Sequence, residues 1–290
     1  MPSIHEPVGA GLTRVWEVDD VVFDARTPYQ QVLIGKTAQG VSLFCDGERQ
    51  STEASQLVYH EALMVPALLL AEQVRRVLVI GSSEGVASQL AVAAGAAHVD
   101  HVDIDEQAVR ACAEHLPYGY PAEELDRASR GEGPVRVSYA DGWAFLAAAP
   151  AGSYDVVVID LPDENTDPEA QHNRLYGTDF LRHCVRVLAP GGVVTCQAGC
   201  PTLWRNETLR ASWRRFGEVF GTVLYFGSDE HEWAFLSGRV DRVADPGALV
   251  ARRFAERGSR AATLDAEALL AGSTPPYSLR HDTGPDQFRQ

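Results

Sequence analysis

The chain has 290 residues, enough for one large or two small domains with a sizeable hydrophobic core. Its formal net charge of -15 at pH 7 argues against a nucleic-acid partner, because binding to phosphates needs a basic face. No stretch resembles a signal peptide or a membrane span, and five scattered cysteines are typical of a reduced cytoplasmic protein, so we expect no membrane partner, no metal and a cytoplasmic location.

The first fifty residues alternate between polar and apolar side chains, as half-buried strands do. Three runs carry this pattern, with glycine-containing turns after two of them: 14–18, 31–34 and 41–44. We therefore predict a small N-terminal antiparallel β domain over residues 1–54. A helix is expected to follow, from about residue 55 to residue 72.

Strand and helix patterns then alternate, which is typical of an α/β domain with a mainly parallel sheet. Strands are predicted at 77–81, 99–104, 135–139, 154–160, 192–197, 219–226 and 232–237. Helices are predicted at 84–94, 105–115, 141–149, 176–188 and 205–217. This pattern predicts a Rossmann-like catalytic domain over residues 55–240.

Two segments do not fit the alternation. Residues 118–134 are rich in Glu, Arg, Gly and Pro, which predicts a solvated insertion. Residues 241–290 are expected to form a C-terminal helical extension with two helices. The tail from Ser273 contains several prolines and is expected to be partly disordered.

The stretch 77–105 predicts a nucleotide-binding βαβ unit. An apolar strand stops at a Gly-Ser-Ser-Glu-Gly turn, a helix follows, and the second strand ends in acids that can accept ribose hydroxyls. The turn has few glycines, so an adenosine site without phosphates is favoured over a pyrophosphate cradle. The alternative is a Rossmann-like domain without a working ligand site.

Acidic residues follow each of the first four strands, where such sheets bind ligands. They are Glu84, Asp103, Asp141, and the pair Asp160 and Asp163. Asp141 could equally be the N-cap of a helix. Asp160 follows six apolar residues, and a carboxylate is costly to bury there unless it serves a function. Two carboxylates three residues apart can bind a cation and take its proton.

These residues, taken together, resemble the polyamine aminopropyltransferases, the spermidine synthase family. The shared motifs span about residues 27–237. They are Tyr29-Gln30, Asp46-Gly47, Gln50, Thr52-Glu53, Tyr59-His60-Glu61, the 82–85 turn, Asp103-Ile104-Asp105, Asp141-Gly142 and Asp160 to Asp163. The loop Asp160-Leu-Pro-Asp-Glu164 resembles that of a divergent, spermidine synthase-like branch of the family.

The resemblance implies a role for each site residue. It also implies that the chain assembles as a homodimer or homotetramer. Decarboxylated S-adenosylmethionine would be the co-substrate, or intact S-adenosylmethionine, with no resident cofactor. Its methylthioadenosine part would contact Gln30, Gln50, Asp103 and Asp141, and its aminopropyl ammonium would contact Glu84. An amine acceptor would contact Tyr59, His60, Asp160 and Asp163, with Asp160 as the base. His60 could alternatively be structural.

One departure concerns the acceptor half, where Ser228, counted back from Trp233, stands at the position of an acceptor-binding tyrosine of the family. Three hypotheses follow. The chain is an aminopropyltransferase acting on a diamine or polyamine, another S-adenosylmethionine-using transferase or cyclase (methyl or 3-amino-3-carboxypropyl chemistry), or a non-catalytic nucleoside-binding homologue. Glu84 favours the first, because its carboxylate suits a donor that ends in an ammonium without a carboxylate.

Overall fold

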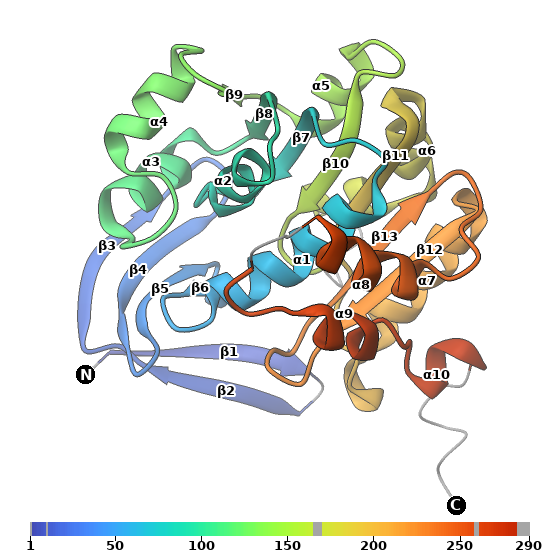
Figure 1. Ribbon diagram of the computed structural model, residues 1–290. Coiled ribbons are helices and arrows are strands. Elements are labelled where there is room, and N and C mark those ends of the chain that lie inside the picture. The colour runs from blue at the N-terminus through green and yellow to red at the C-terminus, as the bar shows by residue number, and fades with distance from the viewer. Residues whose placement is uncertain (1, 10, 165–169, 258–260, 283–290) are drawn as a thin grey trace, which may run out of the picture.

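The computed structural model of the chain describes residues 2–9, 11–164, 170–257 and 261–282. A seven-stranded sheet forms its centre, in the order β12-β13-β11-β10-β7-β8-β9 (Figure 1). β13 is antiparallel to both of its neighbours, and the other pairs are parallel. The bounds are β7 Arg76–Gly81, β8 His98–Asp103, β9 Val135–Tyr139, β10 Tyr154–Asp160, β11 Leu188–Gln197, β12 Thr222–Gly227 and β13 Ala234–Arg239.

Helices cover both faces of this sheet, because its central strands are apolar on both sides. Val156, Val157 and Val158 of β10 are all fully buried. One face packs against α1 Gln56–Leu70, α2 Val86–Ala93, α4 Ala122–Ser129, α8 Pro246–Glu256 and α9 Ala266–Gly272. The other packs against α5 Gly142–Ala148, α6 Thr178–Val187 and α7 Glu207–Val219.

The N-terminal strands form two further units beside the central sheet. β1 Ser3–Gly9 and β2 Leu12–Glu17 make a hairpin. β3 Asp20–Arg26, β4 Gln31–Thr37, β5 Gly40–Cys45 and β6 Glu48–Thr52 make a four-stranded antiparallel sheet. Val32, Ile34 and Leu43 of this sheet share an apolar cluster with α3 Glu106–His115, which fixes the small sheet against the central one.

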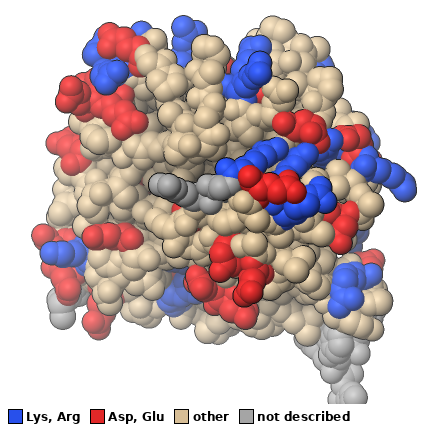
Figure 2. Space-filling view, viewed as in Figure 1, with Lys and Arg blue, Asp and Glu red and all other residues tan. Residues whose placement is uncertain are grey.

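The predicted fold class, a Rossmann-like α/β sheet with a small N-terminal antiparallel β domain, is confirmed. The strands and helices predicted for the α/β block are all present, with ends shifted by a few residues. The division into 1–54, 55–240 and 241–290 stays a prediction. Among the described residues, no helix is both long and apolar enough to span a bilayer. Acidic side chains are spread widely over the face seen in Figure 2.

One prediction about irregular segments needs correction. Residues 118–134 are not simply a solvated insertion, since α4 forms there and buries Leu125 and Ala128, while Tyr120 is buried just before it. The tail contains a short helix, α10 Tyr277–Arg280, with Leu279 buried. Two or three apolar side chains are enough to dock each segment. The rest of the tail, 283–290, lies outside the described residues.

Candidate active site

A cavity of about 380 Å³ lies at the carboxyl ends of β7, β8 and β10, with side chains of β5 and β6 on its other side. The chain order of the sheet reverses between β7 and β10, and open α/β sheets bind ligands at such a point. Nine of the ten predicted site residues line this cavity: Gln30, Gln50, Tyr59, His60, Glu84, Asp103, Asp141, Asp160 and Asp163.

The turn after β7 joins two strand ends and carries Glu84. Gly81 has a φ of 82°, and a Cβ atom there would collide with the backbone oxygen of Asp160. The Ser82 N–H donates to that same oxygen at 2.9 Å. The turn thus lies directly against the end of β10, and it places Glu84, which is 7% exposed, in the cavity wall.

Asp103 ends β8 with its carboxylate held from both sides. One oxygen accepts the Asp105 N–H at 2.8 Å, and the other accepts the Ser83 hydroxyl at 2.8 Å. Burial raises the pKa of Asp103 to about 6, although these two hydrogen bonds oppose the shift. A carboxylate oriented in this way can accept two further hydroxyl groups, which is the pattern expected at a ribose.

Gln30 reaches the cavity through the N-terminus of α3. Asp105 is the N-cap of that helix and accepts the Ala108 N–H at 3.1 Å. Its second oxygen accepts the Thr27 hydroxyl at 2.7 Å and the Gln30 amide at 3.1 Å. Asp105 follows Asp103 by two positions, so the helix cap holds Gln30 beside Asp103.

Asp141 is the N-cap of a helix and also lines the cavity. One oxygen caps α5 by accepting the Ala144 N–H at 2.8 Å. The other pairs with the guanidinium of Arg174, which also lines the cavity. The N-cap role does not remove Asp141 from the cavity wall, so the two interpretations are compatible.

Asp160 lies at the end of β10 against two side chains of α1. The Tyr59 hydroxyl donates to one carboxylate oxygen at 2.7 Å, and His60 Nε2 lies 3.7 Å from the other. Burial, followed by the charge of Asp160, raises the pKa of Tyr59 well above its usual value. Tyr59 therefore remains a hydrogen-bond donor that orients the carboxylate. His60 Nδ1 meets the Gln56 backbone oxygen at 2.7 Å.

Asp163 is positioned by groups from three other elements. The Gln197 amide at the end of β11 donates to its carboxylate, and Trp233 also donates to it. The Tyr176 hydroxyl donates to the backbone oxygens of Leu161 and Pro162, which fixes the intervening loop. Burial raises the pKa of Asp163 despite the amide and the nearby Arg205, so its proton affinity is higher than that of an exposed aspartate.

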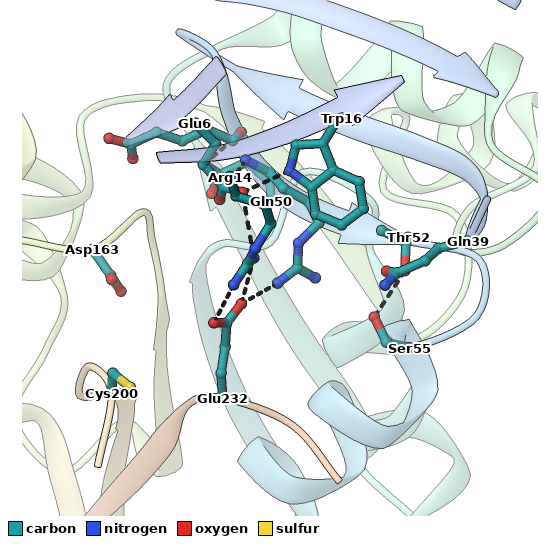
Figure 3. Close-up of polar contacts among 12 residues, drawn as sticks. Glu6, Arg14, Trp16, Gln39, Gln50, Thr52, Ser55, Asp163, Cys200 and Glu232 are labelled. Atoms are coloured by element: carbon teal, nitrogen blue, oxygen red, sulfur yellow. Dashed lines mark hydrogen bonds and ion pairs between the residues drawn. The ribbon is translucent and has the colours of Figure 1, made fainter. Parts of the chain in front are cut away.

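A cluster of charged residues surrounds Glu232, the residue before Trp233 in the chain (Figure 3). Glu232 accepts two hydrogen bonds from Arg14, at 2.7 and 2.9 Å, one from Arg49 at 2.6 Å, and one from Arg205 at 3.2 Å. The Arg49 guanidinium lies 4.6 Å from the centre of the Trp233 ring. These contacts join the N-terminal strands to the Trp233 segment, and Trp233 in turn lies 5.8 Å from Tyr59, centre to centre.

Ser228 is the predicted site residue that the structure does not bring to the cavity. It lines a different cavity of about 540 Å³, between the end of β12 and α9. Its hydroxyl accepts the Glu230 N–H at 3.1 Å, as expected in a turn. Ser228 lines this second cavity because the loop after β12 turns toward α9. Its distance along the sequence from Trp233 therefore does not fix where the side chain lies.

The sequence analysis missed two residues of the cavity wall, Glu48 and Arg174, and one residue that holds Asp163, Gln197. Gln197 ends a predicted strand, and this position could have identified it, as it did the acids. Glu48 lies between two motif residues, Gly47 and Gln50, and alternation with Gln50 on a strand was an available signal. Nothing in the sequence marks Arg174, which lies on a short 3-10 helix, Gln171–Tyr176.

Comparison with known proteins gives one consistent result. Residues 56–226 match the family described as "Spermine/spermidine synthase domain". The polyamine aminopropyltransferase of Prochlorococcus marinus is 32% identical over 234 residues, covering 78% of each chain. The enzyme of the same name from Aeropyrum pernix is 30% identical over 248 residues, covering 82% of this chain and 74% of that one.

Solved structures show the same fold at lower sequence identity. A spermidine synthase in complex with the transition state analogue AdoDATO superposes with a TM-score of 0.81 at 18% identity, covering 96% of this chain and 94% of the other. The spermidine synthase of Thermotoga maritima gives a TM-score of 0.80, also at 18% identity. At this identity the superpositions support the fold, and the function has to be argued from the site.

Proposed function

Because this chain belongs to the spermine/spermidine synthase family, we propose that it is a polyamine aminopropyltransferase. It transfers the aminopropyl group of decarboxylated S-adenosylmethionine to a diamine or polyamine and releases methylthioadenosine. The observation that carries this proposal is one cavity in which a buried Asp160, oriented by Tyr59, lies at the strand end next to the turn that holds Glu84.

The two halves of the cavity suit the two substrates. Asp103 and Gln30 offer hydrogen-bonding groups for an adenosine, and Asp141 together with Gln50 extends that wall. Glu84 offers a carboxylate for the ammonium of the aminopropyl group. Asp160 and Asp163 then lie on the acceptor side, with Tyr59 and His60.

The reaction is an in-line displacement. The acceptor nitrogen attacks the carbon bonded to the sulfonium sulfur, the carbon–sulfur bond breaks, and its electron pair leaves with neutral methylthioadenosine. The acceptor must first lose a proton, since aliphatic amines have a pKa of about 10 by analogy with lysine. Asp160 takes that proton while the Tyr59 hydroxyl holds the carboxylate in place. Asp163 contributes negative charge and orientation on the same side.

The rival transferase chemistry needs a group that receives the carboxylate of intact S-adenosylmethionine. Among the described residues that line the cavity, Arg174 is the one arginine, and its guanidinium is paired with Asp141. This pairing favours the decarboxylated donor. All five cysteines are free thiols, which supports a cytoplasmic enzyme, and a homodimer or homotetramer remains our expectation for the assembly.

The deciding experiment is an incubation of the purified protein with either donor and a panel of amines, following methylthioadenosine release. Turnover of the decarboxylated donor with a diamine or polyamine is the expected result. Equal or faster turnover of intact S-adenosylmethionine would instead assign the chain to the rival class. Binding of methylthioadenosine without turnover of either donor would indicate a non-catalytic homologue.

A further inference from the structure

Two of the carboxylates that line the active-site cavity, Glu48 and Glu84, stand apart from the rest. Among the described residues, neither carboxylate meets a hydrogen-bond donor or a cation of the protein. The other acidic residues of the wall are each engaged: Asp46 with Arg26, Asp103 with Ser83, Asp105 with Gln30, Asp141 with Arg174, Asp160 with Tyr59 and Asp163 with Gln197. A partly buried carboxylate without a protein partner suits a cationic ligand.

Glu48 faces the cavity from β6, next to Cys45 of β5. These two residues are paired across the strands, and side chains of such a pair point to the same face of the sheet. Glu48, Cys45 and Gln50 line the cavity, whereas Arg49 packs on Trp16 and Trp233. Glu48 is therefore part of the same cavity wall as Gln50.

The electrostatic surroundings put Glu48 on the acceptor side. Burial raises the pKa of Glu48, and Asp163 is the neighbouring charge with the largest effect, ahead of Glu6 and Asp46. Glu84 lies on the donor side, since it follows Ser83, whose hydroxyl donates to Asp103. The two unpartnered carboxylates therefore lie in different halves of the cavity.

The other glutamates near this end of the cavity are already saturated. Glu232 is bound by three arginines. Glu6 accepts the Trp16 ring N–H at 2.7 Å, the Arg49 backbone N–H at 3.2 Å and an Arg14 contact at 3.3 Å. A ligand cation would have to displace these partners, so among the described glutamates at this end of the cavity Glu48 is the one without a protein partner.

Resting on the proposed function, we propose that Glu48 binds the second ammonium group of the acceptor and thereby selects diamines and polyamines over monoamines. The reacting nitrogen lies at Asp160 and gives up its proton there. The distal nitrogen stays protonated throughout, and Glu48 accepts a charge-assisted hydrogen bond from it. Such a bond to a charged group is worth about a tenfold to hundredfold difference in affinity.

The test compares two acceptors and two carboxylate variants. An α,ω-diamine and the monoamine of equal chain length are assayed by methylthioadenosine release, with wild type, Glu48→Gln and Glu48→Asp. We expect Glu48→Gln to lower the ratio of kcat/KM for diamine over monoamine by about tenfold or more, mainly through the KM of the diamine. Glu48→Asp keeps the charge and should retain most of the preference. Glu17→Gln, on an exposed face of β2, is the matched control.

A second measurement separates this inference from the proposed function. The same two amines are titrated into the protein saturated with methylthioadenosine, and melting curves check that each variant is folded. If no donor is turned over, the proposed function fails, and the titration still decides about Glu48. An unchanged diamine preference in folded Glu48→Gln, by turnover or by titration, overturns the inference. An equal loss for both amines also overturns it.

Discussion

Replacing Asp160 by asparagine separates proton removal from substrate positioning at this site. The side chain keeps its shape, and its amide oxygen can still accept the Tyr59 hydroxyl, which now lies 2.7 Å from the carboxylate. It can no longer accept a proton from the amine. General-base catalysis contributes about 10²–10⁴ in rate, so turnover should fall by that factor, equivalent to about 2.7–5.4 kcal/mol in the activation free energy.

The assay is kcat for methylthioadenosine release at saturating diamine, together with the dissociation constant of methylthioadenosine. The dissociation constant should change by less than about threefold, because Asp160 contacts the acceptor and not the nucleoside in this proposal. Raising the pH by two units increases the unprotonated amine about a hundredfold below its pKa, and the variant should recover activity accordingly. Asp20→Asn, exposed on β3, is the control.

Two results would refute the assignment of Asp160 as the base. The first is a variant that retains more than a tenth of the wild-type kcat near neutral pH. The second is a variant that is inactive but gains nothing as the pH rises toward the pKa of the amine, since Asp160 would then act in some other way. A large loss of methylthioadenosine affinity would show that the substitution disturbs the donor half as well.

Three further predictions address the donor half. Methylthioadenosine at a hundredfold its dissociation constant should raise the free energy of unfolding by about 2.7 kcal/mol, seen as a higher Tm, and no shift at millimolar ligand would contradict the donor site. Glu84→Gln should weaken the decarboxylated donor and narrow its advantage over intact S-adenosylmethionine by about tenfold, measured as a ratio of kcat/KM; an unchanged ratio would remove Glu84 from donor selection. Because the pKa of Asp103 is raised to about 6, methylthioadenosine affinity should fall as the pH drops through 6, and Asp103→Asn should lose that dependence. Because the pKa of Asp103 is raised, its ionisation lowers the free energy of unfolding of the protein without ligand. The stabilising contribution of Asp103 should therefore decline as the pH rises from about 4 through 6.

The α/β block was predictable because its signals are strong and local. β10 is an unbroken apolar run, and Asp160 marks its end as plainly as Gly81 marks the end of β7. The N-terminal sheet was harder. No residue of β3 is fully buried, although Phe23 packs partly against the apolar cluster of this sheet, so the place of β3 depends on its pairing with β4. Tertiary contacts of that kind cannot be seen in one stretch of sequence.

In the candidate site, too, some residues could be predicted from local sequence signals and others could not. Strand ends gave Asp103, Asp141 and Asp160, because parallel strands bring their carboxyl ends to one edge. The partners that orient these acids come from distant elements, such as Arg174 for Asp141, and no local pattern pairs them. Ser228 shows the converse error, since a position inferred by counting from Trp233 fails when the loop between them takes a different course.

The carboxylates of this cavity also explain why it should prefer substrates with several positive charges. Burial raises the pKa values of Asp103, Asp163 and Glu48, and neighbouring carboxylates add to the shift for Asp103 and Glu48. The free protein thus bears a cost for keeping them ionised, and each bound cation relieves part of it. Before the acceptor ammonium loses its proton it repels the sulfonium, by up to about 4 kcal/mol at 4 Å for an effective dielectric of 20. Carboxylates distributed on both sides offset this repulsion at the moment the two substrates meet, which a cavity with a single acidic residue could not do.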